Sequence, residues 1–125
     1  SHSNARGACF HLRNLSDEMI RQLAERGGVT GINFCPSFLR EEEPAAKKAS
    51  TMDMVRHMKY LRNVGGIDII GLGTDFDGFS GETDVPDTAH MQHLADVMSH
   101  EGFTDEEIEK VFSKNVLRVF RECWK

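Results

Sequence analysis

The chain has 125 residues, of which 39% are apolar and 28% charged, and twenty acidic against fifteen basic residues give it a formal net charge of −5. This composition supports a folded core and excludes the low-hydrophobicity, high-charge signature of disorder. The acidic balance argues against a nucleic-acid partner, because proteins that bind the phosphate backbone carry a basic excess or patch. The longest uncharged run, Gly27 to Leu39, is shorter than the roughly 18 to 20 apolar residues of a transmembrane helix.

The cysteines indicate a reducing environment. Cys9, Cys35 and Cys123 are odd in number, widely separated and never spaced as CxxC. This pattern is typical neither of a disulfide framework nor of a structural zinc site, so we expect reduced thiols in a cytoplasmic protein. The chain starts on Ser1 without an initiating Met, which we interpret as a cut end, and the lack of a targeting segment therefore carries no weight.

The first half of the chain predicts a helix, a strand and a connection. Ser16 is a suitable N-cap for a helix that carries an apolar stripe and ends at Gly27-Gly28. Residues 29–35 form a short β-favouring run that Pro36 stops. The charged, Ala-rich segment 40–50 is expected to be a solvated connection.

The second half repeats the alternation. Thr51 is expected to cap a helix over about 51–64, and the apolar run 67–74 predicts a strand buried on both faces. A polar loop to Asp87 precedes a third helix over about 88–100. Thr104 and Glu107 form a capping box for a fourth helix, and the C-terminal segment is again helical.

Strand, crossover helix and strand in this order predict a parallel α/β sheet. Only two complete strands are readable, and a third must precede Ser1 if His2 lies at a strand end. A parallel sheet of this size leaves open edges and uncovered apolar faces. The chain is therefore interpreted as a portion of a larger α/β fold.

Three positions are candidates for chemistry. Asp75 and Asp77 follow the second predicted strand, where α/β folds place their sites, although a turn with a capping Asp is the alternative. The loop fits neither a calcium-binding EF-hand nor a phosphate-binding loop. Arg13 could hold a carboxylate with its two-pronged guanidinium, or be merely solvated. His2 alone carries little weight, because no histidine here has metal-site spacing.

Several short motifs in order resemble one family. They are Ser1-His2-Ser3-Asn4-Ala5-Arg6, Cys9, Arg13-Asn14 followed by Asp17-Glu18, Gly31-Ile32-Asn33-Phe34, Gly71-Leu72-Gly73-Thr74-Asp75-Phe76-Asp77-Gly78 and Asn115-Val116-Leu117-Arg118-Val119-Phe120. Together they resemble the C-terminal part of the membrane dipeptidase (renal dipeptidase) family of zinc peptidases, especially its bacterial members. The resemblance runs from Ser1 to about Arg121.

The resemblance implies a fold, a cofactor and site residues. The family is a metal-dependent (β/α)8 TIM barrel, which needs about 250 residues, so residues 1–125 would supply about three C-terminal βα units of one domain. It implies two zinc ions, with His2 as a metal ligand. Arg13 would pair with the free carboxylate of a dipeptide, and Asp75 would contact the substrate amine and handle the proton. The full-length protein would hydrolyse dipeptides, as a homodimer in many relatives, whereas the isolated chain is expected to be inactive.

Two departures and two alternatives remain open. Leu12 stands where many relatives have proline, and the loop from Phe79 to Asp87 is shorter than in many relatives, which leaves the substrate preference open. The family's other metal ligands would all lie before Ser1. The chain could therefore be a non-catalytic fragment or degenerate relative that only binds or assembles, or an unrelated phosphate-binding α/β domain.

Overall fold

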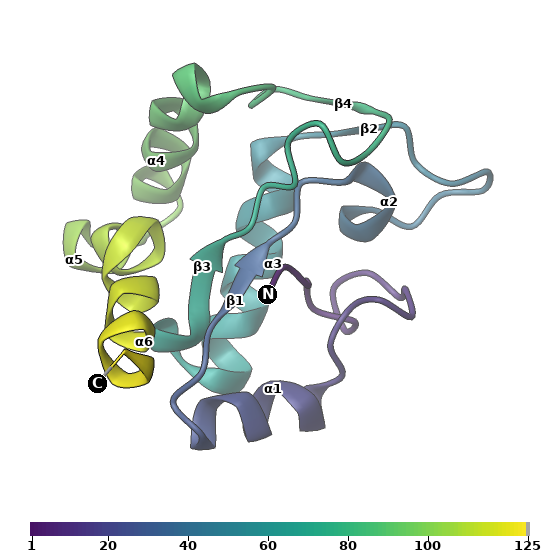
Figure 1. The fold of residues 1–125 in the computed structure, drawn as a ribbon. Helices are drawn as coiled ribbons and strands as arrows, with labels where there is room; N and C mark the ends of the chain where they lie inside the picture. The colour runs from purple at the N-terminus through teal and green to yellow at the C-terminus, as the bar shows by residue number, and fades with distance from the viewer. Residues whose placement is uncertain (125) are drawn as a thin grey trace.

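The computed structural model describes residues 1–124, and Figure 1 shows helices packed around a small parallel sheet. In chain order the elements are α1 (Asp17–Glu25), β1 (Thr30–Ile32), α2 (Pro36–Leu39), β2 (Lys48–Ala49), α3 (Thr51–Gly65), a 3-10 turn (Ile67–Ile69), β3 (Ile70–Leu72), β4 (Glu82–Thr83), a 3-10 turn (Thr88–His90), α4 (Met91–His100), α5 (Asp105–Glu109), a π-helical turn (Lys110–Lys114) and α6 (Asn115–Cys123).

The central sheet is parallel, as predicted. β1 pairs with β3 in the register Thr30 to Ile70, Gly31 to Gly71 and Ile32 to Leu72. On the other side of β1, His2 forms a parallel bridge with Gly31, and the amide of Gly31 donates a hydrogen bond to the carbonyl of Ser1 at 2.8 Å. The start of the chain therefore lies as a third extended segment beside β1 (Figure 1).

The crossover between the two strands is α3. Its N-cap is Ser50, whose side chain accepts a hydrogen bond from the amide of Asp53 while the Asp53 side chain accepts one from the Ser50 amide. The prediction of Thr51 as the cap was wrong by one residue. The amide and hydroxyl of Thr51 both donate to the carboxylate of Asp84, at 2.8 and 2.9 Å. The Thr51 side chain thus binds a residue of a distant loop instead of capping the helix.

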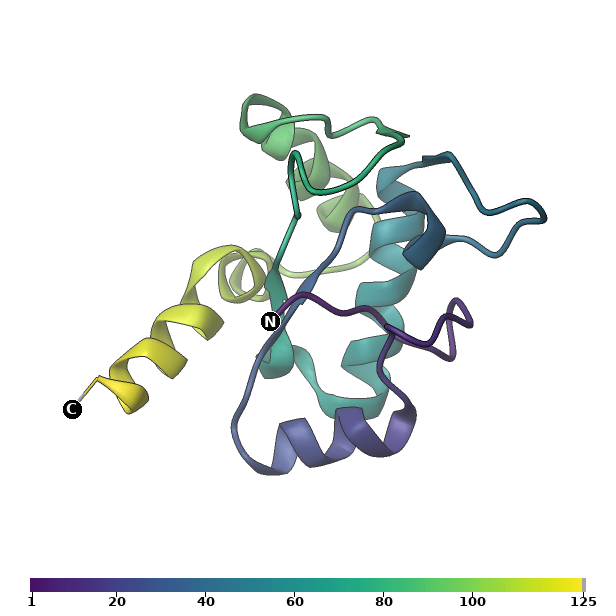
Figure 2. The ribbon, with the colours of Figure 1, turned by 45° about the vertical axis from the view of Figure 1, so that its right-hand side comes forward.

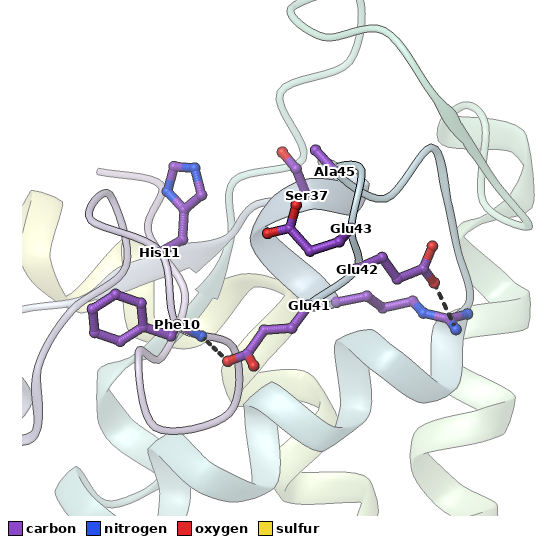
Figure 3. Close-up of a pocket in the computed structure, with 8 residues that line it drawn as sticks. Phe10, His11, Ser37, Glu41, Glu42, Glu43 and Ala45 are labelled. Carbon is purple, nitrogen blue, oxygen red and sulfur yellow. Dashed lines mark hydrogen bonds and ion pairs between the residues drawn. The ribbon is translucent and has the colours of Figure 1, made fainter.

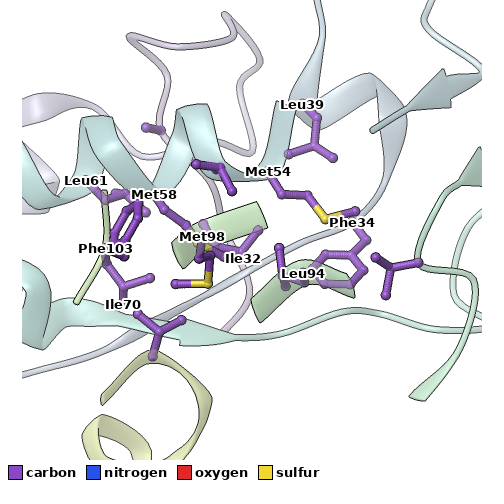
Figure 4. Packing of buried hydrophobic residues seen from close by; sticks show 14 of the residues in the cluster. Ile32, Phe34, Leu39, Met54, Met58, Leu61, Ile70, Leu94, Met98 and Phe103 are labelled. Carbon is purple, nitrogen blue, oxygen red and sulfur yellow. The ribbon is translucent and has the colours of Figure 1, made fainter. Parts of the chain in front are cut away.

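The apolar core lies between the sheet and the helices α3 and α4. Figure 4 shows side chains from these elements meeting across the interface. Fully buried members include Ile32, Phe34, Met54, Met58, Leu61, Ile70, Leu94 and Met98. Burying side chains of this size stabilises a fold by about 1.5 to 3 kcal/mol each, so this interface holds the strands and the crossover helix together.

The C-terminal helices are fastened to the base of the sheet. The predicted capping box of Thr104 and Glu107 starts α5. The π-helical turn joins α5 to α6, and at its end Asn115, which is buried, donates hydrogen bonds to the carbonyls of Ile67 and Ile70, both at 2.8 Å. The start of α6 is thereby fixed against the amino end of β3.

Two segments predicted as plain connections carry a second, two-stranded parallel ladder. β2 and β4 pair Lys48 with Glu82 and Ala49 with Thr83. Segment 40–50 is thus not only a solvated connection, and the polar loop to Asp87 carries the two strand residues Glu82 and Thr83. Pro36 also begins the short helix α2 rather than only ending the strand.

One side of the sheet lacks the helical cover of the other. Figure 2 shows α6 projecting away from the sheet on the side opposite to α3. Its apolar side chains Leu117 and Phe120 are 45% and 52% exposed. No helix within residues 1–124 combines the length and the apolar character needed to cross a membrane.

Candidate functional site

A hollow of about 650 Å³ runs along one face of the parallel sheet, from Val29 just before β1 to Asp75 just after the carboxyl end of β3. Two of the three candidate residues, His2 and Asp75, line it together. Its other walls come from the ends of β1 and β3 and from α6, with the apolar side chains of Val29, Leu72, Val116, Val119 and Phe120. His2 and Asp75, which are 73 residues apart in sequence, therefore line one hollow that reaches the edge of the sheet where parallel α/β folds place ligands.

Glycines let His2 sit close to the strands. A Cβ added at Gly73 would lie 2.6 Å from the Cβ of His2 and 3.2 Å from the Cα of Gly31, so only a glycine fits there. The hydroxyl of Ser1 lies 2.9 Å from Nδ1 of His2. That contact leaves Nε2 as the ring atom free to bind a ligand in the hollow.

Asp75 begins a tight turn after β3. Its backbone φ is 61°, and that of Asp77 is 67°, a left-handed conformation that Asp and Asn tolerate better than most residues. The amide of Gly78 donates to the carbonyl of Asp75 at 2.9 Å and closes the turn. On the β1 side, Nδ2 of Asn33 donates to Oδ2 of Asp75 at 3.4 Å. Asp75 thus lines the hollow with its Oδ1 lying against Gly78 of the same turn, and Asp77 is exposed.

Arg13 does not line this hollow. It lies on the loop between the first bridge and α1, with its guanidinium 4.8 Å from the ring centroid of Phe38. The ring of His11 packs on the same phenylalanine at 4.5 Å, and the amide of Arg13 donates to Nδ1 of His11 at 3.1 Å. Stacking of this kind holds the guanidinium of an exposed arginine in place, while its N–H groups can still donate to a ligand.

The loop that carries Arg13 is anchored by buried polar groups. Nδ2 of Asn14 donates to the carbonyls of Cys9 and Phe38, both at 2.9 Å, and Arg6 donates to the carbonyls of Leu12 and Asn14. Buried amides that satisfy several carbonyls at once rigidify a loop. Arg13 therefore projects from a built loop and not from a disordered connection.

A second hollow, of about 610 Å³, lies beside this loop and is strongly acidic. Figure 3 shows Phe10 and His11 on one wall and the run Glu41, Glu42 and Glu43 on another. Arg40 pairs with Glu42 at 2.8 Å, and the amide of Phe10 donates to the carboxylate of Glu41. Neither His2 nor Asp75 lines it, so the two hollows are separate features.

The thiols and the metal-binding groups limit the chemistry. Burial raises the pKa of the Cys9 thiol, aided by the charge of Glu41, so this cysteine stays protonated near neutral pH and is no candidate nucleophile. Cys9, Cys35 and Cys123 are unpaired in the structure. Across residues 1–124 there is no cluster of three or more His, Cys, Asp or Glu side chains able to hold a metal ion. His2 could supply one ligand, but these residues do not complete a zinc site.

Two further residues near the site were not singled out from the sequence. Asn33 was noted only as part of the Gly31-Ile32-Asn33-Phe34 motif, yet it contacts Asp75. His57 was set aside for lack of metal spacing, yet it is fully buried and bonded to both Ala5 and Leu39. Asp75 lies 42 residues from Asn33, and the partners of His57 lie 52 residues away (Ala5) and 18 residues away (Leu39), so no local pattern could have found these contacts.

Comparison with known proteins gives one consistent family. The family model of the membrane dipeptidases (peptidase family M19) matches residues 1–124. A Klebsiella pneumoniae relative described as "Uncharacterized protein in pqqA 5'region" is 35% identical over 124 residues, 99% of this chain and 46% of the relative. Dipeptidase tcpJ of Claviceps purpurea is 33% identical over 123 residues, 98% of this chain and 28% of that protein. The chain thus spans less than half the length of these relatives.

Solved structures agree with this. Dipeptidase AC, a metallopeptidase of family M19, superposes with a TM-score of 0.91 at 29% identity, covering 98% of this chain and 36% of that one. A metallopeptidase of Rhodobacter sphaeroides, bound to a phosphinate mimic of the dipeptide L-Ala-D-Ala, gives a TM-score of 0.88 at 29% identity, covering 96% and 34%. The α/β fold described above is shared with both. This chain belongs to the membrane dipeptidase family, peptidase family M19.

Proposed function

We propose that this chain is the C-terminal portion of a zinc-dependent dipeptidase and supplies about three βα units of its (β/α)8 barrel. The observation that carries the proposal is the meeting of His2 and Asp75 in one hollow that reaches the carboxyl end of β3, within a family match over residues 1–124. Active sites of TIM-barrel enzymes lie at this end of the strands. The exposed apolar side chains of α6 fit a surface that the rest of the barrel covers.

In this proposal Asp75 is the proton-transfer residue. Asp75 lines the hollow, and its Oδ2 accepts a hydrogen bond from Asn33 while its Oδ1 lies against Gly78, so the carboxylate is held in place. A positioned carboxylate can take a proton from the attacking water and return it to the leaving amine, which typically contributes about 10²- to 10⁴-fold to the rate. Asp75 would also attract the ammonium group of the substrate.

Arg13 is proposed to bind the free carboxylate of the dipeptide. Its guanidinium is exposed and stacked on Phe38, and arginine matches a carboxylate with two parallel N–H donors. Recognition of a terminal carboxylate restricts hydrolysis to very short peptides when the scissile bond lies one residue away. The dipeptide mimic bound to the Rhodobacter sphaeroides relative supports the same substrate class.

The proposed cofactor is a pair of zinc ions, to which this chain contributes His2. The remaining ligands are proposed to come from the part of the full-length protein that this chain does not span. Zinc, when bound, supplies an activated water near neutral pH. The two alternatives from the sequence, a non-catalytic module and a phosphate-binding domain, lack a supporting observation, since the strand-end loop presents carboxylates rather than a nest of free amides.

The decisive experiment compares the full-length protein with the 125-residue chain. We expect the zinc-loaded full-length protein to hydrolyse free dipeptides, to hold two zinc ions and to lose activity with a chelator. The isolated chain is expected to bind zinc weakly and to be inactive, since a single histidine does not make a metal site. A folded, zinc-loaded full-length protein without activity on any dipeptide would refute the proposal in favour of a binding role. Homodimerisation and a cytoplasmic location stay predictions.

A further inference from the structure

Two buried asparagines connect the three parallel segments at the site. Asn4 and Asn33 are both fully buried. The amide of Asn33 donates to Oδ1 of Asn4 at 2.7 Å, and Nδ2 of Asn4 donates to the carbonyl of Asn33 at 2.9 Å. Asn4, two residues after His2, therefore binds both the amide and the carbonyl of Asn33 with its side chain.

The orientation of the Asn33 side chain is fixed by its own neighbours. Its Oδ1 accepts a hydrogen bond from the amide of Cys35 at 2.8 Å. Since that oxygen is occupied by a backbone donor, the amide group cannot be turned over without burying two unsatisfied groups. The NH₂ end is consequently the end that faces Asp75, at 3.4 Å from Oδ2.

We propose that Asn33 is a positioning residue, which fixes the Asp75 carboxylate beside the hollow by donating its side-chain N–H to Oδ2. This inference rests on the proposed function, because it concerns the residue assigned to proton transfer. The Asn4–Asn33–Asp75 chain of contacts makes the position of Asp75 depend on the segment that carries His2. His2 and Asp75 are thereby held in a fixed relative position on either side of β1, although they do not hydrogen-bond to each other.

The geometry explains why an asparagine suits this position. An amide donor stabilises the ionised carboxylate without adding a positive charge that would repel a metal ion or the substrate ammonium group. At 3.4 Å the contact is at the long end for a hydrogen bond, and such contacts in ligand-free sites commonly shorten when substrate binds. We therefore expect a moderate contribution, which acts on turnover more than on substrate affinity.

The principal test is Asn33→Asp in the zinc-loaded full-length protein. Asp retains the oxygen that accepts from Cys35 and nearly the same volume, but replaces the donor that faces Asp75 by an oxygen. We expect kcat to fall about tenfold or more, with KM changed less than threefold and the zinc content unchanged. The matched control is Asn115→Asp, the same change at a buried asparagine whose Nδ2 donates to the carbonyls of Ile67 and Ile70 at the far end of β3. It should lower stability without a selective loss of kcat.

A second measurement does not depend on activity. In the full-length protein labelled with ¹⁵N at asparagine, the side-chain amide resonance of Asn33 should shift in the Asp75→Asn variant and stay in place in Asp77→Asn. An unmoved Asn33 resonance in both variants would overturn the inference, as would a kcat loss in Asn33→Asp no larger than that in Asn115→Asp. If the resonance shifts but the wild-type protein hydrolyses no dipeptide, the contact stands and the proposed function fails instead.

Discussion

His57 on α3 links the segment that leads into the Arg13 loop to the core through the backbone of Ala5. Its Nδ1 accepts a hydrogen bond from the amide of Ala5 at 3.2 Å, and its Nε2 donates to the carbonyl of Leu39 at 3.1 Å. Only the neutral imidazole can accept on one nitrogen and donate from the other. One buried ring therefore fastens the start of the Arg13 loop and the end of α2 to the crossover helix.

The first prediction is a loss of stability in mild acid. Burial lowers the pKa of His57 from 6.5 to about 4, with the Arg56 charge acting in the same direction, against the Leu39 carbonyl and Asp53. The folded state thus binds the proton less readily than the unfolded state. The contribution of neutral His57 to the free energy of unfolding is complete above about pH 6.5. It is lost as the pH falls toward 4, and the total loss is about 3 kcal/mol. Urea unfolding of the chain at several pH values measures this slope.

The control for His57 is Gln, which can accept from Ala5 and donate to Leu39 but does not titrate. Carboxylates also protonate below pH 5, and the difference between the wild-type chain and His57→Gln removes their contribution. We expect the free energy of unfolding of the wild-type chain to fall relative to that of His57→Gln as the pH falls from 6.5 toward 4. Parallel curves for the two proteins would show that His57 is not the group responsible.

The second prediction concerns the close approach of His2 to Gly73. A Cβ at position 73 would lie 2.6 Å from the Cβ of His2 and 3.2 Å from the Cα of Gly31, so the backbone around it leaves no room for the added methyl group. Gly73→Ala should displace the His2 segment and cost about 1 to 3 kcal/mol of stability. In the full-length protein it should also reduce the zinc content, measured by metal analysis of the purified protein.

Gly71 provides the comparison for Gly73. A Cβ there would lie 3.1 Å from a methyl of Val116 and 3.3 Å from a methyl of Val29, both side-chain atoms that can shift. Gly71→Ala should therefore lower stability less and leave the zinc content intact. Equal zinc losses in both variants would show that the effect comes from general disturbance of the strand, not from His2.

The third prediction separates binding from structure at Arg13. Arg13→Ala in the full-length protein should weaken the binding of a free dipeptide by about 1.5 to 3 kcal/mol, the contribution of a hydrogen bond to a charged group. Arg13→Lys should recover only part of this, because lysine lacks the two-pronged donor and stacks less well on Phe38. Steady-state kinetics with free and C-terminally amidated dipeptides give the measurement. Identical losses for both substrates would make Arg13 a structural residue.

Local sequence signals predicted the elements that depend on neighbouring residues. Ser16 caps α1 by accepting from the amide of Met19, and Thr104 with Glu107 starts α5, both as expected. The parallel pairing of two strands around a crossover helix followed from the alternation alone. In these cases the stabilising contact lies within a few residues, or the connection permits only one arrangement.

Elements that depend on distant partners could not be predicted. The β2–β4 ladder joins residues 34 apart and has only two pairs, too few for an alternating apolar pattern. Thr51 was assigned the cap that Ser50 makes because its partner, Asp84, lies 33 residues away. The roles of Asn33 and His57 are of the same kind. The candidate residues His2, Arg13 and Asp75 were identified through resemblance to the family, whereas spacing alone left each of them open.

The last prediction distinguishes the two carboxylates of the strand-end turn. Asp75 lines the hollow and contacts Asn33, while Asp77 is exposed on the far side of the turn. Both have positive φ, which asparagine also tolerates, so Asn at either position should keep the backbone. Asp75→Asn still accepts from Asn33 but can no longer take up a proton. In the full-length protein we expect its kcat to fall about 10²- to 10⁴-fold with zinc retained, and Asp77→Asn to affect mainly stability or substrate affinity. Turnover and metal content are measured on the same preparations. Full turnover in Asp75→Asn would make the residue structural, and loss of zinc would make it a metal ligand instead.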